Sequence, residues 1–242
     1  MNLAIDIGNT FTKIALFDNN VLKSYVISEK VMDAIHLANS KEVDHIMICS
    51  VGKDINHYLN LVENKERIMV LNQECKLPFE LNYNTPETLG VDRIAAIAGG
   101  MQLYPHTNLL VLDLGTCITY DFIDAKSIYQ GGAISPGMVM RFKALNQYTA
   151  KLPLISNPGK NISVLGKSTT ECLESGVVNG LIAELNYQID FYKSKYDNVQ
   201  VVICGGDAKY FETKLKEDFV LCAELVMLGL NNILQYNNAT NA

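Results

Sequence analysis

Residues 4–13 of the chain read Ala4-Ile5-Asp6-Ile7-Gly8-Asn9-Thr10-Phe11-Thr12-Lys13. An apolar run ends in an acid and is followed by a glycine, a hydroxyl and a lysine, which predicts a strand, a tight turn and a return strand. Gly8 lets the backbone approach a ligand closely. The turn N–H groups, the Thr10 hydroxyl and Lys13 can face phosphate oxygens, and Asp6 can hold a divalent ion through water. A hairpin with a capped turn explains this stretch about equally well, because such tripeptides are common.

The same pattern returns later in the chain. There the sequence reads Leu109-Leu-Val-Leu-Asp113-Leu-Gly115-Thr116-Cys-Ile-Thr119-Tyr-Asp121, again a strand, an Asp-x-Gly-Thr turn and a second strand. The separation far exceeds a solenoid period and indicates two similar half-molecules. Jointly, the two turns favour phosphate binding over the structural explanation, in which Asp6 and Asp113 cap turns and Lys13 is a surface residue. Two such turns facing one cleft can hold a nucleoside triphosphate, an arrangement that resembles the superfamily of acetate and sugar kinases, heat-shock chaperones and actin.

Composition and charge narrow the classes of function. Of the 242 residues, 48% are hydrophobic and 19% are charged, which is ample for a core and argues against disorder. The net charge of −6 argues against an electrostatic footprint for nucleic acid. No Cys-x-x-Cys pair occurs among the six cysteines, and the four histidines lack metal-ligand spacing, so a zinc site has little support. Without a secretion signal or an apolar run of membrane-spanning length, the sequence predicts a cytoplasmic protein that binds no membrane.

The order of apolar runs predicts an α/β protein. Strands are expected at 3–6, 12–17, 21–27, 45–49 and 67–71, and again at 109–113, 118–123, 128–134, 199–204 and 219–222. Helices are expected at 29–39, 55–62, 91–103, 138–147, 170–192, 208–216 and 224–235. This order resembles two duplicated ribonuclease-H-like domains with a cleft between them, the actin-like ATPase fold. We place the boundary near Pro105-His106, which gives an N-terminal lobe at 1–106 and a C-terminal lobe at 107–242.

Phosphoryl transfer also needs an acceptor hydroxyl that is oriented and relieved of its proton. The segment Thr88-Leu89-Gly90-Val91-Asp92-Arg93 places an acid and a base side by side at a helix start. The helix dipole stabilises acids there, so a cap explains Asp92, and a surface ion pair explains Arg93. By spacing alone these structural explanations are the stronger ones. The functional alternative is that Asp92 accepts a substrate proton while Arg93 binds a substrate carboxylate.

Three further segments combine glycines or hydroxyls with the ends of elements. Gly131-Gly132-Ala-Ile-Ser-Pro136-Gly137 lies between a strand and a helix, where it can line the cleft with backbone or simply provide tight turns. Cys204-Gly205-Gly206-Asp207 ends a strand and opens a helix, where it can admit an adenosine or phosphate group. Ser168 lies three residues before Glu171, the spacing of a capping box, so this segment is first of all a helix start.

Five motifs follow one another along nearly the whole chain. They are Asp6-Ile-Gly-Asn9-Thr10-x-x-Lys13, Pro86-x-x-Leu-Gly90-Val-Asp92-Arg93, Asp113-Leu-Gly-Thr116-x-x-Thr119, Gly131-Gly132-x-Ile-x-Pro136-Gly137 and Gly166-Lys-Ser-Thr169. In this order and spacing they resemble the type III pantothenate kinase family. The resemblance implies ATP-dependent phosphorylation of pantothenate on its primary alcohol, giving 4'-phosphopantothenate in the first step towards coenzyme A. Two departures, Cys204 where the family often has Thr and Cys117 where a small residue is common, concern details of nucleotide contact.

The resemblance also implies roles for individual residues. Asp92 would be the catalytic general base. The residues implied to bind ATP are Asp6, Ile7, Gly8, Asn9, Thr10, Phe11, Thr12, Lys13 and Thr116. The residues implied to bind pantothenate are Tyr83, Gly90, Val91, Asp92, Arg93 and Thr169. Asp113 would bind a monovalent cation, K⁺ or NH₄⁺, and Asp6 would hold Mg²⁺ or another divalent ion through water. The family is a homodimer whose substrate pocket is completed at the subunit interface, which would explain the position of Thr169 so far along the chain.

Two other functions fit the same fold. A non-catalytic relative that binds nucleotide as a regulatory or assembly module would be expected to have lost Asp92, Arg93 or Lys13, and all three are present. A kinase of the same fold acting on another small alcohol, such as a sugar, would phosphorylate sugars and leave pantothenate unchanged. The lack of a Cys/His cluster of the kind that some sugar kinases carry weakly disfavours it.

Overall fold

The computed structural model describes residues 1–8, 11–50 and 55–241. Contacts divide the chain into two compact units. The first comprises Met1–Thr107, Ile123–Gly131 and Glu224–Ala242, and the second comprises Asn108–Phe122 and Gly132–Ala223. The first break lies beside the lobe boundary expected from sequence. The two later segments that belong to the first unit were not expected in it, because their own sequence carries no sign of what they pack against.

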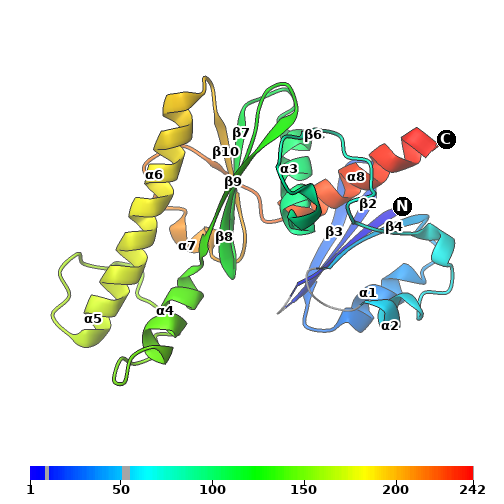
Figure 1. Cartoon of the computed structure of the whole chain (residues 1–242). Helices are drawn as coiled ribbons and strands as arrows, with labels where there is room; N and C mark the ends of the chain where they lie inside the picture. The colour runs from blue at the N-terminus through cyan, green and yellow to red at the C-terminus, as the bar shows by residue number, and fades with distance from the viewer. Residues whose placement is uncertain (9–10, 51–54, 242) are drawn as a thin grey trace. The chain divides into compact units, whose positions relative to one another are not determined.

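The first unit is built on a five-stranded sheet of order β3-β2-β1-β4-β5 (Figure 1). Its strands are β1 (Asn2–Ile7), β2 (Thr12–Asp18), β3 (Val21–Ser28), β4 (His45–Ser50) and β5 (Ile68–Val70). Strands β1, β2 and β3 pair antiparallel, whereas β4 and β5 continue parallel to β1. This is the meander followed by parallel strands that the sequence predicts for one ribonuclease-H-like domain.

The two faces of this sheet are covered by different helices. Side chains alternate along a strand, so Leu3, Ile5 and Ile7 of β1 point to one face. There they join a buried cluster with α1 (Val31–Ala38) and α2 (Asn56–Leu59). Ala4 and Asp6 point to the opposite face, which contacts α3 (Val91–Leu103) and α8 (Leu225–Asn241). Asp6 therefore lies on the face covered by the helix that begins next to Asp92.

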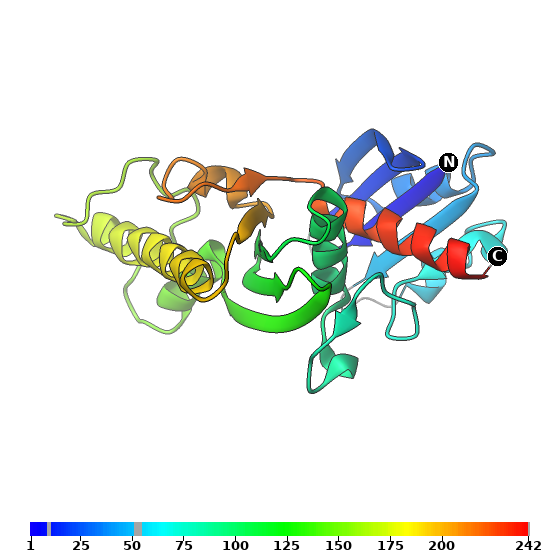
Figure 2. The same ribbon diagram turned by 90° about the horizontal axis from the view of Figure 1, so that it is seen from above.

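Helices α3 and α8 approach each other unusually closely, and Figures 1 and 2 show them side by side. A Cβ built on Gly229 of α8 would lie 1.7 Å from the Ala95 carbonyl oxygen, and one on Gly99 would lie 2.0 Å from the Leu225 carbonyl oxygen. The Asn232 Nδ2 also donates a hydrogen bond of 2.9 Å to the Ala98 oxygen. Only glycine allows this backbone approach, and it fixes α3 against the C-terminal helix.

The second sheet repeats the topology of the first. Its order is β11-β10-β7-β8-β9-β6, so that β9, β8, β7, β10 and β11 correspond in sequence to β3, β2, β1, β4 and β5. The bounds are β7 (Leu109–Leu114), β8 (Cys117–Ile123), β9 (Ile128–Pro136), β10 (Gln200–Cys204) and β11 (Val220–Leu221). The short strand β6 (Glu80–Leu81) adds to the start of β9. The repeated order confirms the duplicated α/β fold expected from the sequence.

The second unit carries its helices after β9. They are α4 (Met138–Gln147), α5 (Thr169–Glu174), α6 (Gly180–Lys195) and the short α7 (Ala208–Phe211). The expected single helix at 170–192 is helical throughout, but a π-helical turn over Ser175–Asn179 separates α5 from α6. The expected helix at 208–216 ends at Phe211, because the following chain turns so that Leu215 and Phe219 pack against the core of this unit.

The remaining elements connect these parts. Two 3-10 turns cover Lys65–Arg67 and Pro86–Thr88, the second just before α3. None of the helices in the described part of the chain combines the length and apolar character that crossing a membrane requires.

Candidate active site

The first Asp-Gly turn is closed by its backbone. The Gly8 N–H donates a hydrogen bond of 3.0 Å to the Phe11 carbonyl oxygen, and a Cβ built on Gly8 would lie 3.1 Å from that oxygen. Phe11 is exposed, whereas Thr12 is buried at the start of β2. Asn9 and Thr10, two of the predicted ATP-binding residues, lie outside the described residues. The strands on either side of the turn, β1 and β2, pair antiparallel as the sequence predicts.

Three side chains of neighbouring strands lie in one row on the α3 side of the sheet. Asp6 is the register partner of Lys13 on β2 and of Cys49 on β4. The Lys13 Nζ lies 3.6 Å from the Asp6 Oδ2. Sheet pairing therefore brings Asp6 and Lys13 together. Asp6 is buried and Lys13 is half-buried.

The surroundings of Asp6 disfavour the ionised form of its carboxyl group. Burial raises the pKa of this carboxyl most, Lys13 lowers it, and the like charge of Asp92 raises it again, so that the pKa lies above its ordinary value. The pKa of the buried Cys49 thiol is raised well above its usual range by burial and then by Asp6 and Asp92. The charges of Asp6 and Asp92 thus both raise the pKa of Cys49, and the charge of Asp92 also raises the pKa of Asp6. They come from β1 and α3, and only the fold of the first unit brings them together.

Asp92 lies on the first turn of α3, where the missing side chain of Gly90 leaves room for its carboxylate. Its Oδ1 accepts a hydrogen bond of 2.9 Å from the Arg93 N–H, and a Cβ built on Gly90 would lie only 2.5 Å from that same oxygen. Asp92 is half-buried. The cap explanation holds in part, since the carboxylate binds a first-turn N–H. Its position beside Asp6 is a separate feature that capping does not require.

Arg93 is not the surface residue that the structural explanation expected. Its side chain is buried, and its Nη2 donates a hydrogen bond of 3.0 Å to the hydroxyl of Tyr129, which is also buried. The Tyr129 ring lies 5.9 Å from the ring of Tyr83, the predicted pantothenate-binding tyrosine. A Cβ built on Gly131, whose φ is +93°, would point at Tyr83. Arg93, Tyr129 and Tyr83 therefore form one cluster within the first unit.

Tyr129 is the member of this cluster that sequence reasoning missed. It lies on β9, far along the chain from α3, and an apolar-aromatic position on a strand predicts only a core residue. The buried tyrosine hydroxyl was the one available signal, because a buried hydroxyl needs a partner.

The second Asp-Gly-Thr turn lies at the end of β7 and is packed between two glycines. A Cβ built on Gly137 would lie 2.2 Å from the Gly115 carbonyl oxygen, and one on Gly205 would lie 2.4 Å from the Asp113 Oδ1. Gly205 has a φ of +95°, which favours glycine. Thr116 at the tip is exposed. Gly205 and Gly206 thus form a turn after β10, whereas the expectation of tight turns over Gly131–Gly137 is wrong, because Gly131 to Pro136 belong to strand β9. Gly137 and Gly205 line the second Asp-Gly-Thr turn with backbone.

Thr169, the predicted distal contact to pantothenate, is the exposed first residue of α5 in the second unit. The preceding Ser168 accepts a hydrogen bond of 3.2 Å from the Glu171 N–H, as a capping box predicts. The Glu171 carboxylate accepts instead from the Lys167 N–H, at 2.6 Å, so the reciprocal bond is shifted by one residue.

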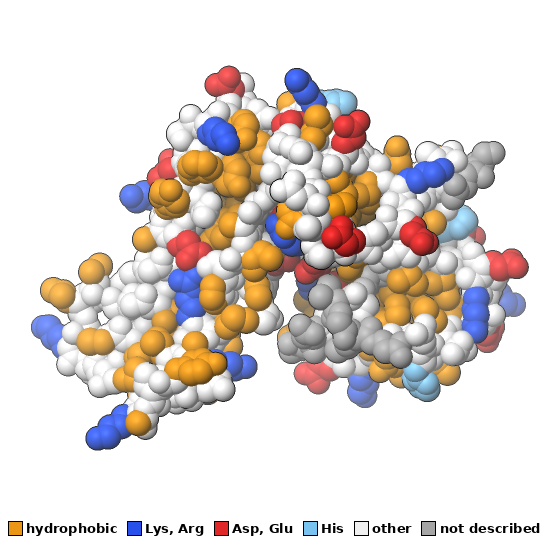
Figure 3. Space-filling model, in the orientation of Figure 1, with side chains coloured by type: hydrophobic (Ala, Val, Ile, Leu, Met, Phe, Trp, Pro, Cys, Tyr) orange, Lys and Arg blue, Asp and Glu red, His pale blue; other side chains and the backbone are white. Residues whose placement is uncertain are grey.

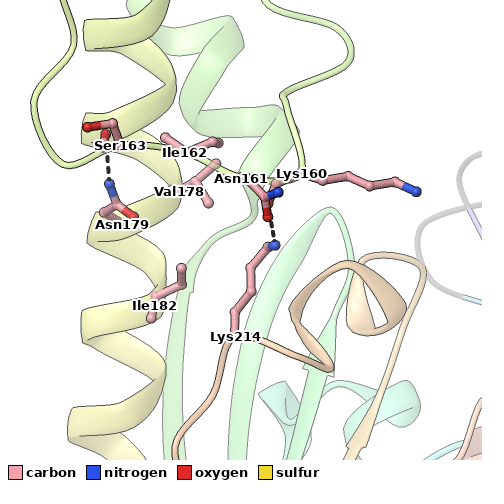
Figure 4. Close-up of a pocket in the computed structure, with 8 residues that line it drawn as sticks. All are labelled: Lys160, Asn161, Ile162, Ser163, Val178, Asn179, Ile182 and Lys214. Carbon is pink, nitrogen blue, oxygen red and sulfur yellow. Dashed lines mark hydrogen bonds between the residues drawn. The ribbon is translucent and has the colours of Figure 1, made fainter.

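A pocket of about 450 Å³ lies elsewhere in the second unit (Figure 4). Figure 4 shows Lys214 reaching the backbone of Lys160, where its Nζ donates a hydrogen bond of 2.6 Å to the carbonyl oxygen. None of its lining residues is a predicted site residue. Within the described ranges, no three His, Cys, Asp or Glu side chains gather in a way that would hold a metal ion on their own.

Comparisons with known proteins relate the chain to one family. The family model described as type III pantothenate kinase matches residues 2–190. A protein of Cytophaga hutchinsonii named type III pantothenate kinase is 40% identical over 237 residues, covering 98% of this chain and 100% of that protein.

Two solved structures show the fold. One from Campylobacter jejuni, described as a conserved Baf family transcriptional activator, matches with a TM-score of 0.66 at 22% identity, covering 98% of this chain and 99% of that one. A glucokinase from an Antarctic psychrotroph matches with a TM-score of 0.53 at 14% identity, covering 97% and 98%. At these identities the likeness concerns the two-sheet fold alone.

Proposed function

Because this chain belongs to the type III pantothenate kinase family, whose members phosphorylate pantothenate in coenzyme A biosynthesis, we propose that Asp92 is its general base. The observation that carries the proposal is that Asp6 points to the face of the first sheet that α3 contacts, and that Asp92, on the first turn of α3, raises the pKa of Asp6 by its like charge. Asp6 is the penultimate residue of β1, the strand that leads into the proposed phosphate-binding turn. A base in that position acts on an alcohol held close to the phosphates.

The transfer follows from these positions. Asp92 takes the proton of the primary alcohol of pantothenate, the alcohol oxygen forms a bond to the γ-phosphorus of ATP, and the bond from that phosphorus to the bridging oxygen breaks to release ADP. Lys13, held beside Asp6, places a positive charge where the phosphates carry negative charge. The remaining residues implied to bind ATP, Ile7 to Thr12, are proposed to line the phosphates.

A divalent ion such as Mg²⁺ fits the two carboxylates. Asp6 is buried and repelled by Asp92, and a cation nearby relieves both the burial cost and the repulsion. When bound with ATP, the ion supplies neutralisation of phosphate charge. Asp6 would hold it through water, because Mg²⁺ usually keeps several water ligands and takes only one or two carboxylates.

Arg93 is suited to the carboxylate of pantothenate. A buried guanidinium oriented by Tyr129 loses little freedom when it forms a charge-assisted pair. Tyr83 lies on the same cluster and provides an aromatic surface for the rest of the molecule. Gly90 and Val91 form the start of α3. Because Gly90 has no side chain, the backbone there is proposed to lie close to the substrate.

The second turn has a proposed role in nucleotide and cation binding. Thr116 would contact ATP through its exposed hydroxyl, and Asp113 would bind K⁺ or NH₄⁺ through its carboxylate. A Cβ built on Gly205 would lie 2.4 Å from the Asp113 Oδ1, so the glycine leaves room beside this carboxylate oxygen, which supports the assignment. Exchange of K⁺ for Na⁺ should lower turnover in the wild type, and Asp113→Asn should remove that difference.

The active form is proposed to be a homodimer in the cytoplasm. In the second unit several large apolar side chains are exposed, among them Tyr148 at 82%, Leu165 at 79% and Val164 at 78%. Figure 3 shows apolar side chains on the surface of the part that carries α4 and α5. Thr169 begins α5 in the same unit and is exposed, so it is accessible to a second copy bound there. No disulfide joins any of the six cysteines, all of which lie in the described residues, and this suits a reducing compartment.

An ADP-release assay with pantothenate, Mg²⁺ and K⁺ tests the proposal. We expect Asp92→Asn to lower kcat by about 10²- to 10⁴-fold, the usual contribution of a general base. Asp33→Asn is the matched control, because Asp33 also lies in the first turn of a helix but on α1. Turnover of Asp92→Asn close to that of Asp33→Asn would refute the assigned base. Phosphorylation of sugars but not of pantothenate would instead indicate the alternative small-alcohol kinase.

A further inference from the structure

A network of side chains holds the segment just before Gly137. Arg141 on α4 reaches back to this segment, where its Nη2 donates a hydrogen bond of 2.9 Å to the Ser135 hydroxyl. Its Nε donates another of 2.9 Å to the Pro136 carbonyl oxygen. Two atoms of one planar guanidinium therefore bind two consecutive residues, which a flexible lysine could not reproduce.

Glu184 on α6 fixes the guanidinium in turn. Its Oε2 pairs with the Arg141 Nη2, and its Oε1 accepts a hydrogen bond of 2.8 Å from the hydroxyl of Tyr120, a fully buried residue of β8. The side chains of Arg141 and Glu184 are 22% and 26% exposed, so this is not an ordinary surface ion pair. Burial acts to raise the pKa of Glu184, but hydrogen bonds from Arg141, Ser135 and Tyr120 outweigh it and lower the pKa.

The network ends at the second Asp-Gly-Thr turn. Gly137 follows directly on the two residues that Arg141 binds, and its N–H donates a hydrogen bond of 3.1 Å to the Thr116 carbonyl oxygen. Because Gly137 has no side chain, its backbone lies so close to Gly115 that a Cβ would overlap the Gly115 oxygen. Any shift of Ser135 and Pro136 is thus transmitted to the backbone that carries Thr116.

We propose that Arg141 and Glu184 are positioning residues that hold the second Asp-Gly-Thr turn in the geometry that binds ATP. The carboxylate of Glu184, anchored by Tyr120, orients Arg141, and Arg141 clamps Ser135 and Pro136 so that Gly137 stays against Gly115 and Thr116. The proposal rests on the proposed contact of Thr116 with ATP. It concerns nucleotide binding alone and assigns neither residue a part in proton transfer.

The test compares Arg141→Lys and Glu184→Gln with the wild type in two measurements. Binding of ATP with Mg²⁺ is measured by titration calorimetry without pantothenate, and the KM values for ATP and pantothenate are measured separately. We expect each variant to weaken ATP binding and raise the KM for ATP about tenfold, which corresponds to about 1.4 kcal/mol. The KM for pantothenate should stay within about twofold of the wild type, because its proposed ligands lie in the first unit, apart from Thr169 on α5, which has no part in this network.

Glu217→Gln is the matched control. Glu217 pairs with Lys193 of α6 at 2.7 Å, so this variant also removes an ion pair from the second unit, but one that contacts neither Ser135 nor Pro136. Tyr120→Phe removes only the hydroxyl that anchors Glu184 and serves if Arg141→Lys fails to fold. We expect it to raise the KM for ATP in the same direction by a smaller factor.

The outcomes separate this proposal from the proposed function. Unchanged ATP binding in Arg141→Lys, Glu184→Gln and Tyr120→Phe, with melting temperatures that fall no differently from Glu217→Gln, would overturn the positioning role. A wild type that binds ATP but does not phosphorylate pantothenate would refute the proposed function, while weaker ATP binding in the variants would still support the network.

Discussion

Lys13 and Asp6 face each other as register partners on antiparallel strands, with the Lys13 Nζ 3.6 Å from the Asp6 Oδ2. This opposite charge does not bring the pKa of Asp6 to its ordinary value, because burial and Asp92 together outweigh it. The ionised form of Asp6 is therefore disfavoured in the folded protein, even with Lys13 beside it. Such a site gains from a bound cation, which is what a kinase brings to it with ATP.

Asp6→Asn should stabilise the fold and remove activity. A carboxyl whose pKa is raised in the folded state gives stability that is fully present below its ordinary pKa of 3.8 and is lost as pH rises through the raised value. At pH 7 the ionised Asp6 therefore costs stability, and asparagine removes that cost. We expect a higher melting temperature for Asp6→Asn at pH 7 and a smaller difference near pH 4, measured by thermal unfolding. A variant less stable than the wild type at pH 7 would contradict the prediction.

Gly90→Ala should impair catalysis more than stability. The added Cβ would lie 2.5 Å from the Asp92 Oδ1, and the end of a side chain moves more easily than backbone. The carboxylate would therefore shift away from its position beside Asp6. We expect kcat to fall at least about tenfold, because catalysis depends on placement within fractions of an ångström. Circular dichroism melts check that stability changes by less than about 1 kcal/mol. An unchanged kcat would show that catalysis does not need the space that Gly90 leaves for the Asp92 carboxylate.

Tyr129→Phe should weaken pantothenate binding selectively. The variant keeps the aromatic ring but removes the hydroxyl that accepts a hydrogen bond from the buried Arg93. Hydrogen bonds to charged groups contribute about 1.5–3 kcal/mol, so the KM for pantothenate should rise about tenfold or more. The KM for ATP serves as the internal control and should change little. Equal rises in both KM values would point to a general loss of structure instead.

Gly229→Ala should destabilise the protein strongly. Its Cβ would lie 1.7 Å from the Ala95 carbonyl oxygen, so α3 and α8 must move apart. We expect a loss of about 1–3 kcal/mol or more in the free energy of unfolding, measured in urea. Gly180→Ala is the matched control in α6, where a Cβ meets no heavy atom of the described residues within 4 Å. It should raise stability by up to about 1 kcal/mol, as alanine does in a helix.

A parallel loss in Gly180→Ala would show that the loss in Gly229→Ala does not come from the close crossing of α3 and α8. The crossing matters for the site as well, since α3 begins at Val91 and carries Asp92 on its first turn. A partly destabilised Gly229→Ala enzyme should therefore also lose turnover at temperatures well below its melting point.

The sequence by itself determined the local features of this protein. The apolar run before Asp6 predicted strand β1, and the Asp-x-Gly pattern at Gly8 and again at Gly115 predicted two hairpin turns and a repeated fold. These features are local, because they depend on side-chain alternation and on the turn preferences of single residues. They were sufficient to indicate the family before any contact was known.

Only the tertiary structure decided which of these parts meet. It placed Asp92 beside Asp6, joined Arg93 to Tyr129, and set Gly137 against the turn at Gly115. Each of these pairs comes from elements distant in the chain, and their approach depends on how helices pack on sheets and on where glycine removes a side chain. No local period or propensity encodes such packing, so the chemistry of the site became visible only when the elements were assembled.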